Sequence, residues 1–331
     1  MKIAVIGAGA MGTLFGGRLA MAGNDVTMIA VSPATIETIN RDGIILDDDS
    51  GHHVIPVMAK RAEDMEEKPE LIMLFTKTLS SRAALEGAKH YIGEGTHMLT
   101  LQNGLGNIEL ISEYVEKDRI IAGVTNYASD SKGPGKISSA GSGYVKIMSA
   151  DLRRSEFLEK VFRLLSDAGF HTAITEDIYT AIWEKAGFNA AINATTAVCR
   201  VPCGGVGSVE EGRRLAAKIA EETAMVAQAY GVKASAEAII RSLENSYTEH
   251  KSHFTSMAQD VGNRKKTEVG FINGGIVKKA KEKGLEVPYT EAVYDLLRVI
   301  EETYDMQMNQ IEGAKYVDKL YDFSKSTGNI K

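Results

Sequence analysis

Cysteine is scarce in this 331-residue sequence, which contains only Cys199 and Cys203. Two cysteines are too few for a disulfide framework, and three residues separate them where a redox motif has two. No histidine lies close to them in the sequence, which argues against a zinc site. We expect both thiols to be reduced and inert and no metal to be bound; a redox pair or half of a metal site is the less favoured alternative.

Long hydrophobic runs and an excess of positive charge are also missing. The apolar run after Lys2 is interrupted by glycine before it could form a signal-peptide core or a membrane span. The 38 basic and 44 acidic residues give a net charge of −6, whereas nucleic-acid binding depends on lysine and arginine. We therefore expect a cytosolic protein with no nucleic-acid or membrane partner.

The length and the composition favour a globular protein of two domains. Hydrophobic residues make up 44% and charged residues 25% of the chain, as in ordinary globular proteins. A chain of 331 residues also exceeds the size at which a single hydrophobic core stops growing.

The first half of the chain alternates short apolar runs with helical stretches, which is typical of βαβ units around a parallel sheet. The predicted strands of this sheet are residues 2–6, 25–29, 71–75, 97–101 and 120–125. The glycine-rich residues 140–143 separate two further strands, 136–139 and 144–148, which we expect to form an antiparallel hairpin that completes the sheet. A helix over 155–168 and a strand over 171–174 follow.

Strand patterns end near residue 175, and the remaining sequence predicts helices bounded by Gly, Pro or polar residues. The expected helices cover residues 178–197, 209–230, 235–246, 266–283 and 289–309. The prediction is an α/β Rossmann-like domain over residues 1–175 and an all-α domain over 176–331. We expect the last residues, 324–331, to be frayed.

Gly7-Ala8-Gly9-Ala10-Met11-Gly12 is a G-x-G-x-x-G element between a buried strand and a helix. In that context Gly7 permits the tight turn, Gly9 lets the backbone approach a pyrophosphate, and Gly12 lets the helix pack close to the sheet. An ordinary glycine-rich turn is the alternative. The position between strand and helix favours dinucleotide binding.

The kind of dinucleotide is normally decided by the residue that closes the second strand, which is an acid for NAD and a base for NADP. Here that place is Ala30-Val31-Ser32, and Asp25 lies at the wrong end of the strand. Ser32, Arg41 or Lys77 could contact a 2′-phosphate, although each could equally be a solvated surface residue.

Polar residues also follow the strand at 97–101 and lie along one predicted helix. Asn103 belongs to an Asn-Gly turn at the strand's carboxyl end, where ligands of open α/β sheets bind. Lys185, Asn189 and Asn193 are spaced four apart and share one face of an otherwise apolar helix. They could form a solvated face, but a crevice lining is favoured because buried polar groups need partners.

A later run places a hydroxyl, Ser256, and a carboxylate, Glu268, where a second long helix is expected to begin. Alone this pattern means little, since a glutamate in a first helical turn is commonly a partner of the helix dipole.

Together these motifs resemble those of the ketopantoate reductase family, within the wider group related to 6-phosphogluconate dehydrogenase. The resemblance covers essentially the whole chain. It implies an NADPH-dependent reduction of 2-dehydropantoate to (R)-pantoate, on the route to pantothenate and coenzyme A, and a possible homodimer. The residues that carry it are Gly7–Gly12, Lys77, Gln102–Gly106, Lys185, Asn189, Asn193, Ser256–Asp260, Glu268 and Ile272–Gly274.

The resemblance also implies roles for these residues. Lys185 would be the general acid, and Glu268 would bond the new hydroxyl or order Lys185. Burial would lower the pKa of Lys185 and a neighbouring carboxylate would raise it, so the two effects oppose each other. The residues expected to hold the substrate are Asn103, Lys185, Asn189, Asn193, Ser256 and His253, and those expected at the cofactor are Gly7–Gly12, Ser32, Lys77 and Asn103.

Two positions depart from the family pattern. Val31 stands where the family usually has an arginine, and His253 stands where it often has an asparagine. Both departures keep open a D-2-hydroxyacid dehydrogenase of the same fold that uses NADH on branched or aromatic 2-oxo acids. A third, less favoured hypothesis is a dinucleotide-sensing protein without chemistry, for which a proton donor such as Lys185 would have no use.

Overall fold

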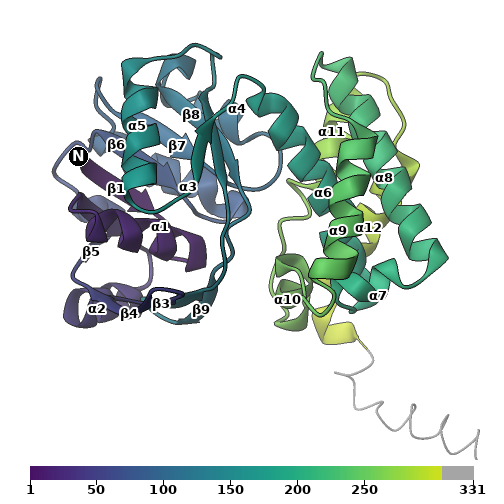
Figure 1. The fold of residues 1–331 in the computed structure, drawn as a ribbon, viewed down its shortest axis with the longest axis horizontal. Coiled ribbons are helices and arrows are strands. Elements are labelled where there is room, and N and C mark those ends of the chain that lie inside the picture. Colours follow the sequence, from purple (N-terminus) through teal and green to yellow (C-terminus); the bar gives the residue numbers. More distant parts are fainter. Residues whose placement is uncertain (308–331) are drawn as a thin grey trace, which may run out of the picture.

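A computed structural model of the chain describes residues 1–307. It has two lobes, one built on β-sheet and one of helices, and the chain passes between them at residues 175–177 (Figure 1). This arrangement confirms the predicted fold class, a Rossmann-like domain followed by a helical one. The division at residue 175 remains our proposal, and the expected fraying of 324–331 lies outside the described residues.

The main sheet of the N-terminal lobe has eight strands in the order β12-β11-β8-β7-β6-β1-β2-β5. Neighbouring strands are parallel except β8 and β11. The carboxyl ends of β1, β2, β6, β7 and β8 therefore lie along one edge, where such sheets bind ligands. The strands are β1 (Lys2–Ile6), β2 (Asp25–Ile29), β5 (Met58–Lys60), β6 (Leu71–Leu74), β7 (His97–Thr100), β8 (Ile120–Thr125), β11 (Val145–Ser149) and β12 (Thr172–Ile174).

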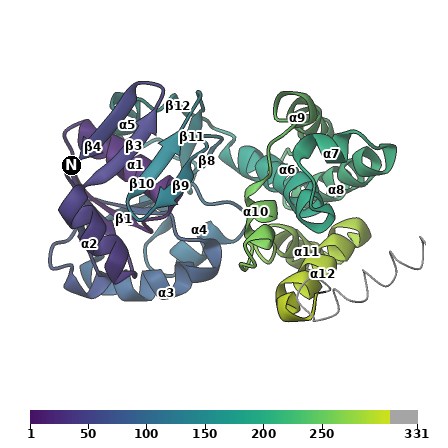
Figure 2. The same ribbon diagram turned by 90° about the horizontal axis from the view of Figure 1, so that it is seen from below.

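Helices cover both faces of this sheet, which is why its strands are apolar on both sides. Ile3 and Val5 of β1 pack into the core under α1 and α5, whereas Ala4 and Ile6 pack into the core with α3 and α4. Figure 2 shows α5 on one side of the sheet and α3 and α4 on the other. The helices of this lobe are α1 (Ala10–Met21), α2 (Pro33–Asp42), α3 (Thr78–Ala88), α4 (Asn107–Ile111) and α5 (Glu156–Asp167).

A second sheet of four strands, in the order β4-β3-β10-β9, corrects one prediction. The expected hairpin of residues 136–139 and 144–148 is wrong, because β10 pairs with β3 and β9 while β11 pairs with β8. The Gly133–Gly135 turn joins β9 to β10, and Ile45 N donates to Gly135 O, which holds β10 beside β3. The strands are β3 (Ile44–Asp48), β4 (Gly51–Ile55), β9 (Asp130–Gly133) and β10 (Lys136–Ser139).

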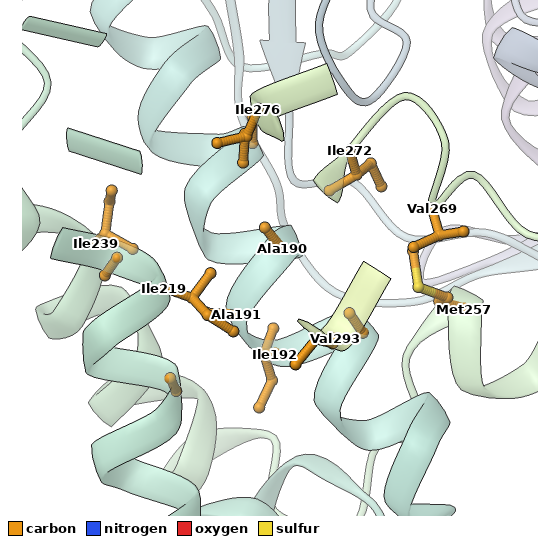
Figure 3. Close-up of a cluster of buried hydrophobic side chains, with 14 of the residues drawn as sticks. Ala190, Ala191, Ile192, Ile219, Ile239, Met257, Val269, Ile272, Ile276 and Val293 are labelled. Carbon is orange, nitrogen blue, oxygen red and sulfur yellow. The ribbon is translucent and has the colours of Figure 1, made fainter. Parts of the chain in front are cut away.

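The helical lobe is organised around α6 (Ile178–Cys199), whose many small residues let other helices approach closely. A Cβ on Gly187 would lie 2.7 Å from Ile239 Cδ1 of α9. Figure 3 shows Ala190, Ala191 and Ile192 of α6 among apolar side chains of the surrounding elements. The others are α7 (Cys203–Gly207), α8 (Glu210–Ala229), α9 (Ala236–Glu249), α10 (Ser256–Gly262), α11 (Asn273–Glu282) and α12 (Pro288–Glu302). Within residues 1–307, none of the helices has the length and apolar character to cross a membrane.

Two predicted helix boundaries need correction. The helix expected over 266–283 begins only at Asn273, because other bonds hold the residues before it. The Thr267 N–H donates to the buried carboxylate of Glu301, and two successive N–H groups share the Glu268 carbonyl as acceptor. Glu268 therefore stands in a turn and not on a long helix. The helix expected over 289–309 ends at Glu302, and its last two expected residues lie outside the described part of the chain.

Candidate functional site

The turn between β1 and α1 forms a cradle with an open backbone. Gly7 has a φ of 109°, and a Cβ there would lie 2.7 Å from Thr76 N. A Cβ on Gly12 would lie 1.9 Å from Gly7 O, whereas a Cβ on Gly9 would meet nothing within 4 Å. Free N–H groups and the dipole at the start of α1 suit a pyrophosphate. The cradle thus fits a dinucleotide, and the other predicted contacts, Ala8, Ala10 and Met11, lie in the same turn.

The residues after β2 present no charge toward a ribose. The Val31 side chain is 92% exposed. Ser32 caps α2, and its Oγ accepts a hydrogen bond from Thr35 N at 3.4 Å. Arg41 lies about 13 Å further along that helix and makes two hydrogen bonds to Asp42, at 2.7 and 2.8 Å. The guanidinium of Arg41, one of the candidates for a 2′-phosphate contact, is therefore already paired with the Asp42 carboxylate.

Lys77 lies between β6 and α3 and is paired across the two lobes. Its Nζ lies 2.6 Å from Asp260 Oδ1 of α10. The lysine side chain is 49% exposed and the aspartate 18%. The predicted cofactor contact thus carries its own counter-ion.

The polar face of α6 is only partly satisfied by the protein. Lys185 Nζ donates to the Thr125 carbonyl at the end of β8, at 2.7 Å. Asn189 and Asn193 are 6% and 7% exposed, and neither side-chain amide has a hydrogen-bond partner within residues 1–307. Successive members of the face are about 6 Å apart along the helix. Neither amide is among the polar groups that are sealed from solvent without a partner, so both can reach and bind a ligand.

Burial controls the charge of Lys185. It lowers the pKa of the amine to about 8, although the nearby carboxylate of Glu268 acts to raise it. Of the two opposing effects expected from the sequence, burial therefore prevails. At neutral pH the amine is still mostly protonated, and its proton is more readily donated than that of an exposed lysine.

Glu268 is held against the N-terminal lobe. Its Oε1 accepts hydrogen bonds from Thr78 N at 3.1 Å and from Thr78 Oγ1 at 3.2 Å. The same hydroxyl lies 3.3 Å from the Asn103 carbonyl, which also accepts from Asn107 Nδ2. The Asn103 turn, Glu268 and, through its charge, Lys185 are therefore brought together from three distant segments.

Ser256 and His253 are both exposed, but they lie in different surroundings. Ser256 is the first residue of α10, one turn before Asp260, and so shares the helix face that reaches the N-terminal lobe. His253 lies before the helix and lines a separate hollow with Arg200 and Phe254. Neither Lys185 nor Glu268 lines that hollow.

Several residues of this site carry no sequence signal that we used. Thr125 acts through its backbone carbonyl, and Thr78 acts through an N–H as well as a hydroxyl. Asn273 is fully buried, and its Nδ2 donates to the Ala190 carbonyl of α6 at 3.1 Å. Asn273 belongs to the Ile272–Gly274 run of the resemblance, but the sequence does not reveal its partner.

Comparison with family models gives two matches that together cover both lobes. Residues 3–151 match the model described as "Ketopantoate reductase PanE/ApbA", and residues 177–301 match "Ketopantoate reductase PanE/ApbA C terminal". The 2-dehydropantoate 2-reductase of Pyrococcus horikoshii is 35% identical over 305 residues, which are 91% of this chain and 98% of that protein. That of Streptococcus pyogenes serotype M1 is 30% identical over 309 residues, 93% and 100% of the two chains.

Solved structures share the whole fold. D-mandelate dehydrogenase in complex with NADH and anilino(oxo)acetate superposes with a TM-score of 0.88 and 28% identity, covering 92% of this chain and 99% of that one. A PanE/ApbA family ketopantoate reductase from Ralstonia eutropha JMP134 gives a TM-score of 0.85 and 27% identity, with the same coverage.

Proposed function

The chain belongs to the ketopantoate reductase family, and on that premise we propose that it reduces ketopantoate to (R)-pantoate, with NADPH as the leading cofactor. One observation carries the proposal: a lysine with a lowered pKa shares a helix face with two asparagines whose amides have no hydrogen-bond partner within the described residues and still reach solvent. A lysine cation can stabilise the reacting oxygen of a small polar 2-oxo acid, and the neighbouring neutral amides can bind its other polar groups.

In this proposal the chain binds the substrate on the α6 face. Asn189 and Asn193 donate to its carboxylate and hydroxyl groups, and Ser256 and Asn103 close the site from the other elements. Lys185, held by the Thr125 carbonyl, points its ammonium at the 2-oxo oxygen. Because the protein already fixes that donor, little reorganisation is needed when negative charge develops on the oxygen.

A dinucleotide bound beside this face would supply hydride to C2 of the substrate. Lys185 gives its proton to the 2-oxo oxygen, which becomes the hydroxyl of the product. The Glu268 carboxylate, anchored by Thr78, accepts a hydrogen bond from that hydroxyl and favours the uptake of a new proton from solvent by Lys185. The cofactor's pyrophosphate would lie on the Gly7–Gly12 cradle.

A second candidate, an NADH-dependent D-2-hydroxyacid dehydrogenase for branched or aromatic 2-oxo acids, is favoured by one observation. Val31 leaves the carboxyl end of β2 without a base, and its side chain is exposed. The D-mandelate dehydrogenase that shares this fold is described with NADH.

The test compares initial rates with ketopantoate, 2-oxoisovalerate and phenylglyoxylate, each with NADPH and NADH. The highest kcat/KM for ketopantoate supports the first function, and a higher value for another acid with NADH supports the second. Lys185→Met should lower kcat about a hundredfold or more, whereas Lys278→Met, an exposed lysine of α11, should leave it unchanged. No turnover of any acid would refute both.

We also propose a homodimer. Tyr289, Leu296 and Val299 of α12 are 46%, 52% and 61% exposed within the described part of the chain. Light scattering after gel filtration would report one copy per particle if the proposal is wrong.

A further inference from the structure

A cavity of about 430 Å³ lies between the two lobes, beside the Asn103 turn. Its N-terminal wall includes the loop Gly104–Gly106 and the first turn of α4, and its helical wall includes Trp183, Tyr230 and Val232. Neither Lys185 nor Glu268 lines it. A cavity of this volume is in the range that binds small molecules.

The cavity wall is rigidly held. Gly104 and Gly106 have φ values of 85° and 95°, and Leu105 N donates to the Phe271 carbonyl at 2.9 Å. A Cβ on Gly104 would lie 2.6 Å from Phe271 O, so the loop sits directly on the helical lobe. The contacts that hold this loop against the helical lobe therefore also fix the shape of the cavity.

The lining includes several aromatic and apolar side chains. The rings of Trp183 and Tyr230 lie 6.0 Å apart, and Trp183 is 6% exposed. Ile182 and Tyr179 of the same helix also line the space. Such surfaces bind an aromatic or apolar body.

Two carboxylates of the lining are free to accept a hydrogen bond from a ligand. The carboxylates of Glu176 and Asp177 are exposed, and neither makes an ion pair within residues 1–307. Of the two lysines, Lys279 is already paired with Glu109 at 3.0 Å, which leaves Lys233 alone against two carboxylates.

We propose that this cavity is a second binding site, specific for a small aromatic molecule that carries a cationic amine or similar N–H donors. The ring packs on Trp183 and Tyr230, and the donor group faces the carboxylates of Glu176 and Asp177. The proposal needs neither the proposed reaction nor the dinucleotide.

The sequence contains a single tryptophan, so the indole N–H of Trp183 gives one resolvable signal in a ¹H–¹⁵N spectrum. The probes are phenethylamine, 2-phenylethanol and phenylacetate, which share a ring and differ in charge. We expect phenethylamine to shift this signal saturably, with the alcohol weaker and phenylacetate weakest. The shift should persist with saturating NADPH.

Two variants localise the binding. Val232→Phe narrows the cavity and should weaken phenethylamine at least about tenfold. Glu176→Gln with Asp177→Asn should weaken it about three- to tenfold and leave 2-phenylethanol unchanged. The matched control, Asp64→Asn with Glu66→Gln, removes two exposed carboxylates elsewhere and should change nothing. Thermal unfolding checks that each variant is folded.

Three results would overturn the proposal: no saturable shift with any probe, an unchanged affinity in folded Val232→Phe, or tighter binding of phenylacetate than of phenethylamine. A failed reductase assay would bear on none of them, so the two proposals fail independently.

Discussion

Lys77 and Asp260 form an ion pair across the two lobes, with Nζ and Oδ1 2.6 Å apart, although they are 183 positions apart in the chain. Because the lysine is a predicted cofactor contact, the aspartate neutralises charge that a dinucleotide would meet. We predict that Asp260→Asn lowers the Kd for NADPH about two- to fivefold, as expected for a half-exposed pair. Fluorescence titration with NADPH measures this Kd in the wild type and in the variant.

The matched background is Lys77→Met, in which Asp260→Asn should have no effect on the Kd. If the Asp260→Asn effect were the same with and without the lysine, the aspartate would act on the cofactor by another route.

The two glycines of the cradle should respond differently to alanine. Gly12→Ala places a methyl 1.9 Å from Gly7 O, so we expect the free energy of unfolding to fall by about 3 kcal/mol or more. Gly9→Ala meets nothing within 4 Å and should unfold like the wild type. Its methyl would stand where the pyrophosphate approaches, so the Kd for the dinucleotide should rise about tenfold or more. Equal cofactor affinity in Gly9→Ala would place the pyrophosphate elsewhere.

Cofactor choice should change at Val31. An arginine there would add a charge-assisted donor for a 2′-phosphate, so Val31→Arg should raise the ratio of kcat/KM for NADPH to that for NADH about tenfold. Val31→Ala removes the exposed side chain without adding charge and should leave the ratio as it is. An unchanged ratio in Val31→Arg would mean that the ribose does not lie beside residue 31.

The parts of the fold that were predictable are those with long apolar patterns. The fully buried run of β8 and the small apolar residues of α6 each identify one element. Strand β9 (Asp130–Gly133) is polar and exposed along most of its length, and β5 has only three residues, so neither has a pattern. Strand pairing could not be predicted either, because the glycines of a turn do not reveal that β10 pairs with β3 and not with β11.

The candidate site likewise has features that the sequence pattern predicts and features that it does not. The spacing of Lys185, Asn189 and Asn193 placed three side chains on one face because a helix repeats every 3.6 residues. The Thr125 carbonyl that holds Lys185 has no side-chain signal, and the partner of Lys77 lies on another lobe. Whether burial or Glu268 would control the pKa of Lys185 depended on three-dimensional packing, which periodicity does not describe.

The lowered pKa of Lys185 predicts opposite pH dependences for the two directions of the reaction. Reduction needs the ammonium, so kcat/KM should be level below pH 8 and fall about tenfold per pH unit above it. Oxidation of the hydroxy acid needs the neutral amine and should rise up to about pH 8. Profiles of both directions in the same buffers measure this, and parallel profiles would exclude Lys185 as the proton donor.

Burial of the same amine should cost stability. Its pKa falls from 10.5 in the unfolded chain to about 8 in the fold, so the cost is fully present below pH 8 and disappears as the pH rises toward 10.5. Lys185→Met removes the charge and keeps the length, and should raise the free energy of unfolding at pH 7 by about 1–3 kcal/mol. At pH 10.5 the gain should vanish. Urea unfolding at the two pH values tests it, and a Lys185→Met variant less stable than wild type at pH 7 would show that the Thr125 bond outweighs the burial of charge.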